Sequence, residues 1–521
     1  MDIIETTTKL LALFNSKQNP LFDERGVQII ELANKWVKLN QISPLSQEAA
    51  EQYLEMSSKN LYALMFLYSL LGQSKSIKLN FDQLVKQITQ SELHPNEKFF
   101  LYNQLKSLSF QGLNAISKSE LSALYTDILS SFNSYLAPSL RYISASERNN
   151  NLVIVFTGQF LGMQHAPSKT ALDRIRVLIE TLNKEVVFIN TCELLTAAGA
   201  IPWYGSTIST RYEFEQQIIE FKGCHFKFAQ CSKAMPNLQE MASILDVVKA
   251  LRPSFTLTIG ESLLADISSQ IVPNLVIATV FSSLPYTRSQ FRVIGRPVTA
   301  DDSKFLEEQN LSPEGVLESL FTFDFKPQTH HYTRTELNLP SDKFVVMMVG
   351  ARLDSEITTA FIETLRPLFN KGVCFVTVGQ FDCYERYCQQ IPGFEESFVH
   401  LGFQEDILAV LECCDLYLNP PRVGGGSSVA EALYKQKPVV TLNKGDGAVT
   451  ASQAFVVEDD ELLVETICRY KEDAAFYFAQ QQEAEQRAAL LTNSDKAFAE
   501  VIQLAFLNTL FDLPWQVPTK S

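Results

Sequence analysis

The sequence lacks the features that mark membrane, exported or nucleic-acid-binding proteins. No apolar run approaches the ~20 residues that a membrane-spanning helix needs, and the first residues show neither the basic nor the apolar region of a signal peptide. The net charge of −15 argues against broad binding to nucleic acid or anionic membranes, because both need a basic surface. We therefore expect a cytoplasmic protein with no transmembrane segment and no nucleic-acid partner.

Several chemical signatures are missing as well. The nine cysteines show no repeated spacing of the kind that binds zinc, and no Asp-x-Asp motif follows a predicted strand end. A glycine run at 424–426 does not continue into the Gly-Lys-Ser/Thr of a Walker motif, and its spacing differs from the dinucleotide fingerprint. These absences weaken the kinase, NTPase and dehydrogenase hypotheses, and we expect no metal or other cofactor.

The first part of the chain has little glycine and a helical pattern. Apolar residues recur at helical spacing from Ile29 to Leu39 and from Leu61 to Leu71. No firm 34-residue repeat appears, so a tetratricopeptide array is not supported. We predict an all-helical domain over residues 1–147, which could serve as a scaffold or dock a partner protein.

Strands alternate with helices from residue 148 onwards. The predicted strands of the first half lie at 152–156, 186–190, 255–259 and 275–280, and those of the second half at 344–349, 373–378, 398–401, 416–418 and 439–442. This alternation predicts two Rossmann-like, doubly wound α/β domains, at 148–335 and at 336–521 with C-terminal helices. Ligands of such sheets bind at the carboxyl ends of the strands, so we expect a cleft where the two domains face each other.

The stretch from Asp415 to Leu442 carries the clearest functional signal. A predicted strand runs into the glycine turn, and a short helix with Glu431 follows it. Glycines allow close backbone approach, and the free N–H groups at a helix start attract a diphosphate. A carboxylate nearby can accept hydrogen bonds from sugar hydroxyls, so the stretch suits a nucleotide-sugar. The predicted donor-binding residues here are Gly424, Gly425, Gly426, Ser427 and Ser428.

Four further positions follow predicted strands of the second domain. Gly350 and Arg352 follow its first strand, where the Arg352 guanidinium could bind a diphosphate and stabilise its charge as it leaves. Gln380 follows the second strand and His400 ends the third. Both could present groups to a nucleotide base, and a purely structural role for His400 stays open.

The first domain offers candidates for the acceptor side. His165 lies in the loop after the first strand and could hydrogen-bond the sugar or act as a base toward an acceptor hydroxyl. A loop histidine that makes only a local hydrogen bond is the alternative. Ser168 is expected to cap the next helix. Gln164, Glu261 and Tyr286 lie in loops that could line an acceptor site, although ordinary turn chemistry explains the loop of Tyr286 nearly as well.

At these residues the chain resembles nucleotide-sugar glycosyltransferases of the GT-B fold, over roughly residues 150–510. The segment from Asn419 to Val440 is similar to the signature of glycosyltransferase family 4, which is largely retaining. The resemblance implies that Glu431 is the second glutamate of a paired motif and holds the ribose, whereas Val423 stands in the place of the first. Gly350 to Leu353 is similar to the diphosphate loop of that family, with Ala351 inserted.

The layout also resembles bacterial cytoplasmic N-glycosyltransferases related to O-GlcNAc transferase, which carry an all-helical domain before the GT-B core. Leu418 to Pro420 and His165 to Ser168 are similar to stretches of those enzymes. Together the resemblances imply metal-independent, retaining transfer of a hexose, with glucose favoured, from a UDP-sugar to a hydroxyl of a saccharide or protein-linked glycan, such as a protein-bound glucose. The alternatives are an inverting protein N- or O-glycosyltransferase and a non-catalytic partner subunit.

Overall fold

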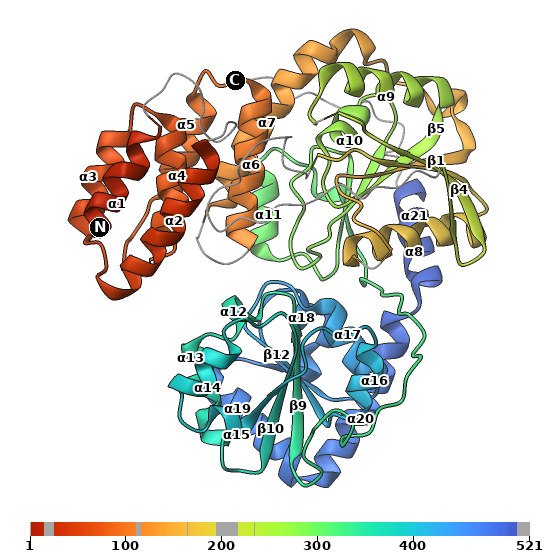
Figure 1. Cartoon of the computed structure of the whole chain (residues 1–521). Helices are drawn as coiled ribbons and strands as arrows, with labels where there is room; N and C mark the ends of the chain where they lie inside the picture. Colours follow the sequence, from red (N-terminus) through yellow and green to blue (C-terminus); the bar gives the residue numbers. More distant parts are fainter. Residues whose placement is uncertain are drawn as a thin grey trace.

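In the computed structural model, the residues described are 2–14, 25–74, 76–110, 116–163, 165–193, 217–233 and 235–507. A helical region comes first in the chain and lies beside a domain built on a central sheet (Figure 1). A second sheet domain lies below these two (Figure 1). Of the helices in the described ranges, none is both long enough and apolar enough to span a bilayer.

In the ranges that the structure describes, seven α-helices form the N-terminal region. Several begin at a residue whose side chain accepts a hydrogen bond from a backbone N–H of the first turn, as at Ser46, Asn60 and Asn80. The last two helices share a hydrophobic core with the first sheet, so the region is packed onto that domain rather than tethered to it. Their bounds are α1 (Ile3–Ala12), α2 (Arg25–Ile42), α3 (Gln47–Ser57), α4 (Leu61–Leu71), α5 (Phe81–Gln90), α6 (Pro95–Phe110) and α7 (Lys118–Leu136).

The first sheet has the strand order β3-β4-β2-β1-β5-β6-β7-β8, and all its pairs are parallel except the β3–β4 hairpin. The predicted strands of this domain are present, whereas the β3–β4 hairpin and the last two strands, β7 and β8, were not predicted. Its strands are β1 (Asn149–Thr157), β2 (Glu185–Asn190), β3 (Ile218–Phe221), β4 (Cys224–Gln230), β5 (Pro253–Ile259), β6 (Asn274–Ile277), β7 (Phe291–Ile294) and β8 (Val316–Glu318). The helices are α8 (Ala166–Glu180), α9 (Leu238–Leu251), α10 (Leu263–Ser268) and α11 (Ala300–Glu308).

The second sheet is parallel throughout, with the order β11-β10-β9-β12-β13-β14. This order reverses between β9 and β12, which is where doubly wound sheets bind ligands. Its strands are β9 (Phe344–Gly350), β10 (Val373–Gly379), β11 (Phe398–His400), β12 (Leu416–Asn419), β13 (Val439–Leu442) and β14 (Val456–Val457). The helices are α12 (Leu353–Glu356), α13 (Thr359–Leu365), α14 (Tyr384–Gln390), α15 (Phe394–Ser397), α16 (Ile407–Glu412), α17 (Gly426–Tyr434), α18 (Gly445–Ala451), α19 (Asp460–Glu472), α20 (Ala474–Leu491) and α21 (Ser494–Leu507).

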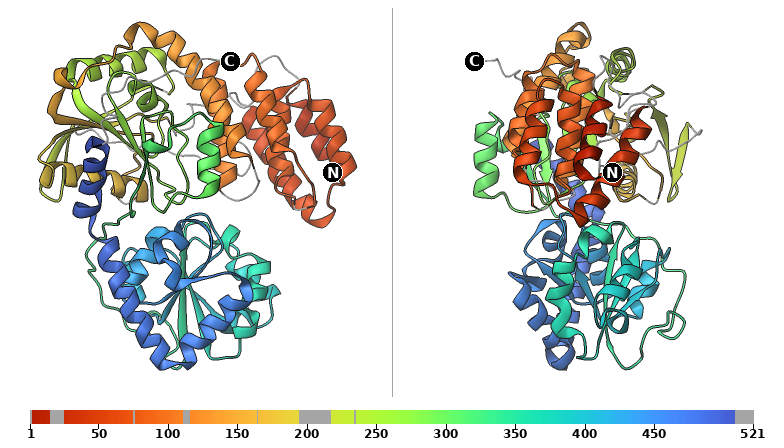
Figure 2. Two further views of the ribbon diagram at one scale, coloured as in Figure 1. Left: turned by 180° about the vertical axis from the view of Figure 1, so that it is seen from behind. Right: turned by 60° about the vertical axis from the view of Figure 1, so that its left-hand side comes forward.

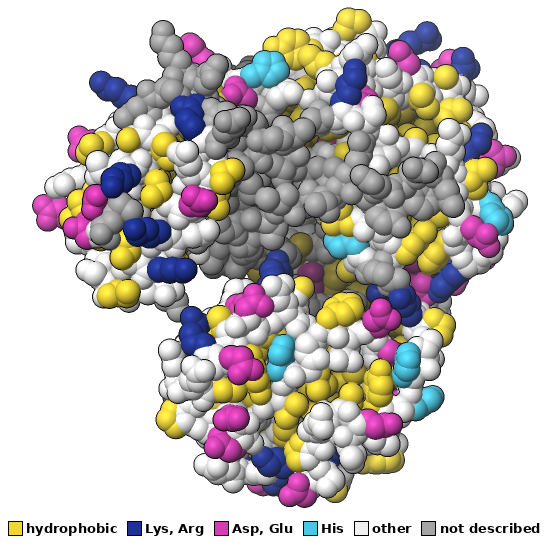
Figure 3. Space-filling view, viewed as in Figure 1, with side chains coloured by type: hydrophobic (Ala, Val, Ile, Leu, Met, Phe, Trp, Pro, Cys, Tyr) yellow, Lys and Arg dark blue, Asp and Glu magenta, His cyan; other side chains and the backbone are white. Residues whose placement is uncertain are grey.

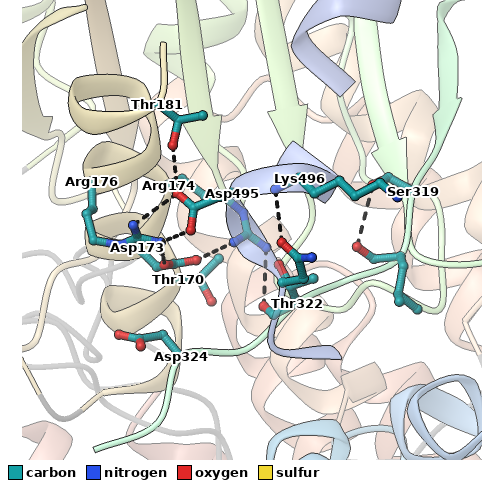
Figure 4. A network of polar contacts seen from close by, with 12 residues as sticks. Thr170, Asp173, Arg174, Arg176, Thr181, Ser319, Thr322, Asp324, Asp495 and Lys496 are labelled. Atoms are coloured by element: carbon teal, nitrogen blue, oxygen red, sulfur yellow. Dashed lines mark hydrogen bonds and ion pairs between the residues drawn. The ribbon is translucent and has the colours of Figure 1, made fainter. Parts of the chain in front are cut away.

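The C-terminal helix crosses back to the first sheet domain. Helix α21 lies beside α8, away from the rest of the second domain (Figure 2). Arg176 of α8 pairs with Asp495 of α21 at 3.1 Å, and the buried Arg174 donates to the backbone oxygen of Thr322 in the linker before β9 (Figure 4). Both chain segments that connect the two sheet domains are thus fixed to α8.

Candidate functional site

A cavity of about 1210 Å³ lies between the two sheet domains. Loops that follow β1, β5 and β6 line it from one side, loops that follow β9, β12 and β13 line it from the other, and α6 forms a further wall. In the space-filling view the surface is hollowed where the lower domain meets the rest of the molecule (Figure 3). The cavity therefore lies at the carboxyl ends of both sheets, where such folds bind their ligands.

The glycine turn lines the cavity between β12 and α17. Gly425 has a φ of +95°, which favours glycine, and a Cβ there would overlap the side chains of Asn419 and Arg422. A Cβ on Gly424 would meet no atom within 4 Å. Ser427 also lines the cavity, whereas Ser428 is not among the described residues that line it. The first N–H groups of α17, which have no partner within the helix, thus lie beside the cavity.

Arg422, whose side chain is 8% exposed, holds this turn in place, a role that the sequence did not suggest. Its guanidinium pairs with Glu356 at 2.9 Å and donates to Asn419 Oδ1 at 2.9 Å and to the backbone oxygen of Val349 at 2.7 Å. Gly350 leaves room for this pair, because a Cβ there would come within 2.6 Å of Glu356 Oε2. Glu356 is 66 residues away in the sequence, so no local pattern could have revealed the contact.

Arg352 lies on the same side of the cavity as the glycine turn. It is half-buried, lines the cavity and begins the short helix α12 at the end of β9. The structure therefore brings together the two groups that the sequence singled out for a diphosphate, a guanidinium and a helix N-terminus. Such a pair can bind an anion through charge-assisted hydrogen bonds.

Gln380 and His400 are not among the described residues that line the cavity. Gln380 is exposed and donates to Asp382 at 3.1 Å. His400 lies within hydrogen-bond distance of the Thr377 hydroxyl through Nδ1, at 3.0 Å, and its ring contacts those of Phe381 and Tyr384. A donor-binding role for these two residues stays a prediction, and His400 has the contacts of a structural residue.

Glu431 lies in α17, one turn beyond Ser427. Burial raises the pKa of its carboxyl to about 7, and the positive charge of Lys169 on α8 opposes that rise. Lys169 belongs to the first sheet domain and lines the cavity. Unlike the glycine turn, Glu431 is not among the described residues that line the cavity, and its low-dielectric surroundings compensate its charge only in part.

His165 lines the opposite side of the cavity. Its Nδ1 atom is buried and has no hydrogen-bond partner in the part of the chain that the structure describes. Burial lowers the pKa of the His165 ring, which favours the neutral form.

The prediction that Ser168 caps α8 was wrong. The helix begins at Ala166 with Pro167 in its first turn, where proline is favoured, and Ser168 is buried within it.

The other acceptor-side candidates lie at the junction with the helical region. Glu261 follows β5, forms an ion pair with Lys106 of α6 and accepts the backbone N–H of Tyr286 at 2.9 Å. Glu261 and Tyr286 both line the cavity, whereas Gln164 lies outside the described residues.

Sequence reasoning missed Asp446. This residue accepts the backbone N–H of Ser282 at 2.9 Å across the cleft, and burial raises the pKa of its carboxyl to about 6.

The comparisons with known proteins agree with this geometry. Residues 343–473 match the family model described as glycosyl transferases group 1. The chain is a glycosyltransferase with the GT-B fold. An O-GlcNAc transferase mutant of Thermobaculum terrenum is 14% identical with a TM-score of 0.55, and the match covers 98% of each chain. HepE of Anabaena, in complex with UDP and glucose, is 16% identical with a TM-score of 0.45, over 69% of this chain and 99% of its own. No curated protein matches the chain significantly.

The comparison with the O-GlcNAc transferase extends over the helical region as well as the two sheet domains, since it spans nearly the whole of both chains. Within the described residues, no group of three or more His, Cys, Asp or Glu side chains is arranged to hold a metal ion.

Proposed function

We propose that this enzyme transfers a hexose, preferably glucose, from a UDP-sugar to a hydroxyl of a saccharide or protein-linked glycan, with retention of the anomeric configuration. The observation that carries the proposal is one cavity bounded by the glycine turn and Arg352 on one side and by His165, Glu261 and Tyr286 on the other. The first set suits a diphosphate, and the second offers hydrogen-bonding groups to an acceptor. Together they provide for two substrates at one site.

The donor half uses charge complementarity. The N-terminus of α17 and the Arg352 guanidinium would bind the diphosphate and stabilise the charge that develops on it as the sugar leaves. The absence of a Cβ at Gly424 leaves open space for this approach. Glu431, with its partly compensated charge, would accept hydrogen bonds from the ribose hydroxyls.

In the retaining reaction, the acceptor hydroxyl attacks the anomeric carbon on the face from which UDP departs. The bond from that carbon to the phosphate oxygen breaks as the bond to the acceptor oxygen forms, and the departing phosphate takes the acceptor proton. No protein base or nucleophile is required. Val423, an apolar residue on the cavity wall, supplies neither.

An inverting protein N- or O-glycosyltransferase is the second candidate, and one observation favours it. His165 Nδ1 is buried beside the cavity without a hydrogen-bond partner in the described residues, and the ring tends toward the neutral form. A neutral imidazole can take a proton from an acceptor nucleophile. Inversion would require such a base, whereas retention would not, so His165→Gln should abolish an inverting reaction and leave much of a retaining one.

The test is a screen of UDP-, GDP- and ADP-sugars with saccharide and glycopeptide acceptors and, separately, hydrolysis of each donor without acceptor. We expect turnover of a UDP-sugar, with UDP-glucose best, and large losses in Arg352→Ala and Glu431→Ala. NMR of the newly formed anomeric centre separates retention from inversion. If no nucleotide-sugar binds or reacts, and both variants behave like the parent, the proposal fails in favour of a non-catalytic partner that acts through its helical region.

A further inference from the structure

Helix α6 forms a wall of the cavity although it belongs to neither sheet. Residues between Asn96 and Ser109 line the cavity, which at about 1210 Å³ exceeds the ~300–1000 Å³ typical of a pocket for one small ligand. Donor binding as proposed uses the glycine turn and Arg352, on the opposite domain. The space beside α6 is therefore available to another part of the substrate.

A compact group of side chains occupies this wall. Lys106 of α6 pairs with Glu261, and both side chains stay about one-fifth exposed, at 22% and 19%. The Lys106 Nζ atom lies 5.2 Å from the ring centroid of Tyr102 and 5.8 Å from that of Tyr286. The Tyr102 hydroxyl is buried nearby with no hydrogen-bond partner in the described chain. The ammonium has three donor positions, so hydrogen-bonding capacity remains beyond the ion pair.

The wall is fixed to the sheet domain rather than loosely apposed. Helices α6 and α7 share their hydrophobic core with β1, α9 and α10. Two amides of α6 add polar contacts, because Asn96 donates to the backbone oxygen of Pro236 at 2.6 Å and Asn103 to that of Glu193 at 3.3 Å. Side chains on α6 are thus held before any ligand arrives, which lowers the cost of ordering them on binding.

We propose that Lys106, Glu261 and Tyr286 form a subsite for a second sugar unit of the acceptor, next to the unit that receives the hexose. Neighbouring hydroxyls of a sugar ring can donate to the carboxylate and accept from the ammonium, and the apolar face of the ring can pack on the tyrosine. This inference rests on the proposed function. It makes the helical region part of the acceptor site and makes the enzyme one that prefers acceptors of at least two sugar units.

The experiment compares acceptors of different length in matched variants. Lys106→Met removes the charge, and Glu261→Gln keeps an acceptor for the backbone N–H of Tyr286. Lys98→Met is the control, because Lys98 forms a second ion pair of α6, with Asp127 at 2.9 Å, and does not line the cavity. Each protein is assayed for kcat/KM with a monosaccharide glycoside, with the corresponding disaccharide and with a peptide carrying one sugar, and for donor hydrolysis without acceptor. Thermal unfolding shows whether each variant is folded.

We expect both subsite variants to lose about ten-fold in kcat/KM with the disaccharide, the effect of one charged hydrogen bond. In Lys106→Met, reaction with the monosaccharide should stay near the parent value, and donor hydrolysis should be unchanged in both subsite variants and in the Lys98→Met control. Equal losses of Lys106→Met with all acceptors, losses confined to the peptide, or no loss with the disaccharide would each overturn the subsite. Absence of donor hydrolysis in the unchanged protein would instead refute the proposed function, and the subsite with it.

Discussion

Replacing Glu431 by Gln should weaken donor binding and at the same time stabilise the free protein. The carboxyl is half-buried in α17, and burial raises its pKa while Lys169 opposes the rise only in part. Gln keeps the shape of the side chain and removes the charge. The charge has a role only when a ligand hydrogen-bonds to it, so stability and function should respond in opposite directions.

The size of the stability change follows from the pKa. Each unit of pKa corresponds to ~1.4 kcal/mol, so a rise from 4.5 to about 7 destabilises the folded, ionised protein by up to about 3 kcal/mol. For a carboxyl whose pKa is raised on folding, this cost is absent at pH below 4.5 and is fully present at pH above 7. At ~2.1 cal/mol/K of unfolding entropy per residue over 521 residues, Glu431→Gln should therefore raise the unfolding midpoint by up to roughly 3 °C at pH above 7, and the difference should vanish as the pH falls.

The functional change has the opposite sign. A hydrogen bond to a charged group contributes ~1.5–3 kcal/mol, so loss of the carboxylate should weaken binding of UDP at pH above 7 by roughly ten- to hundred-fold. In the parent, protonation of Glu431 should weaken UDP binding as the pH falls through about 7. The variant should show no such pH dependence.

Two measurements check this reasoning. Thermal unfolding of parent and variant over a pH series gives the stability difference, and calorimetry with UDP gives the affinities. Glu465→Gln is a suitable control, because the residue is exposed in α19 and does not line the cavity. A stability difference that is constant with pH, or a variant that is less stable than the parent above pH 7, would refute the argument from burial.

Three further predictions concern the surroundings of the diphosphate site. Gly425→Ala should lower the unfolding temperature, since its positive φ and close contacts cost about 1–3 kcal/mol, whereas Gly424→Ala should leave stability unchanged and raise the donor KM; equal unfolding temperatures would contradict this. Arg422→Met leaves Glu356 buried without its partner and should destabilise the protein by about 3–5 kcal/mol, and a thermal scan like that of the parent would argue against a scaffold role. Arg352→Lys keeps the charge but loses bidentate geometry, so kcat should fall about ten-fold at unchanged stability; an unchanged kcat would remove Arg352 from the site.

Much of the fold could be predicted because parallel strands are buried on both faces and appear as unbroken apolar runs. The stretch from Val345 to Val349 is one of these runs. The alternation of such runs with helical patterns predicted the two sheets. The β3–β4 hairpin was not predicted, although exposed and buried residues alternate in Cys224–Gln230 as they do in a half-buried strand. The predicted C-terminal helices include α20 and α21, which are separated at Thr492 and Asn493, where the chain crosses to the first domain.

The site was predictable only where its chemistry is local in the sequence. The glycine turn and Arg352 follow strand ends, so their type and position identify them. Contacts such as that of Lys106 with Glu261 join residues 155 positions apart, so the sequence indicated Glu261 as a candidate but not its partner. Asp446 is likewise distant from its partner Ser282, which lies 164 positions away on the other domain.

One loop connects the donor side to the acceptor side. The ring of Phe281 packs so closely on Gly426 that a Cβ there would come within 2.5 Å of it, and the next residue, Ser282, donates its N–H to Asp446. Tyr286, at the other end of the loop, is held by Glu261. The residues from 281 to 286 thus touch the helix N-terminus proposed for the diphosphate and the wall proposed for the acceptor. The separation of the two substrates then depends on this loop, and glycine at 426 is needed for packing as much as for anion binding.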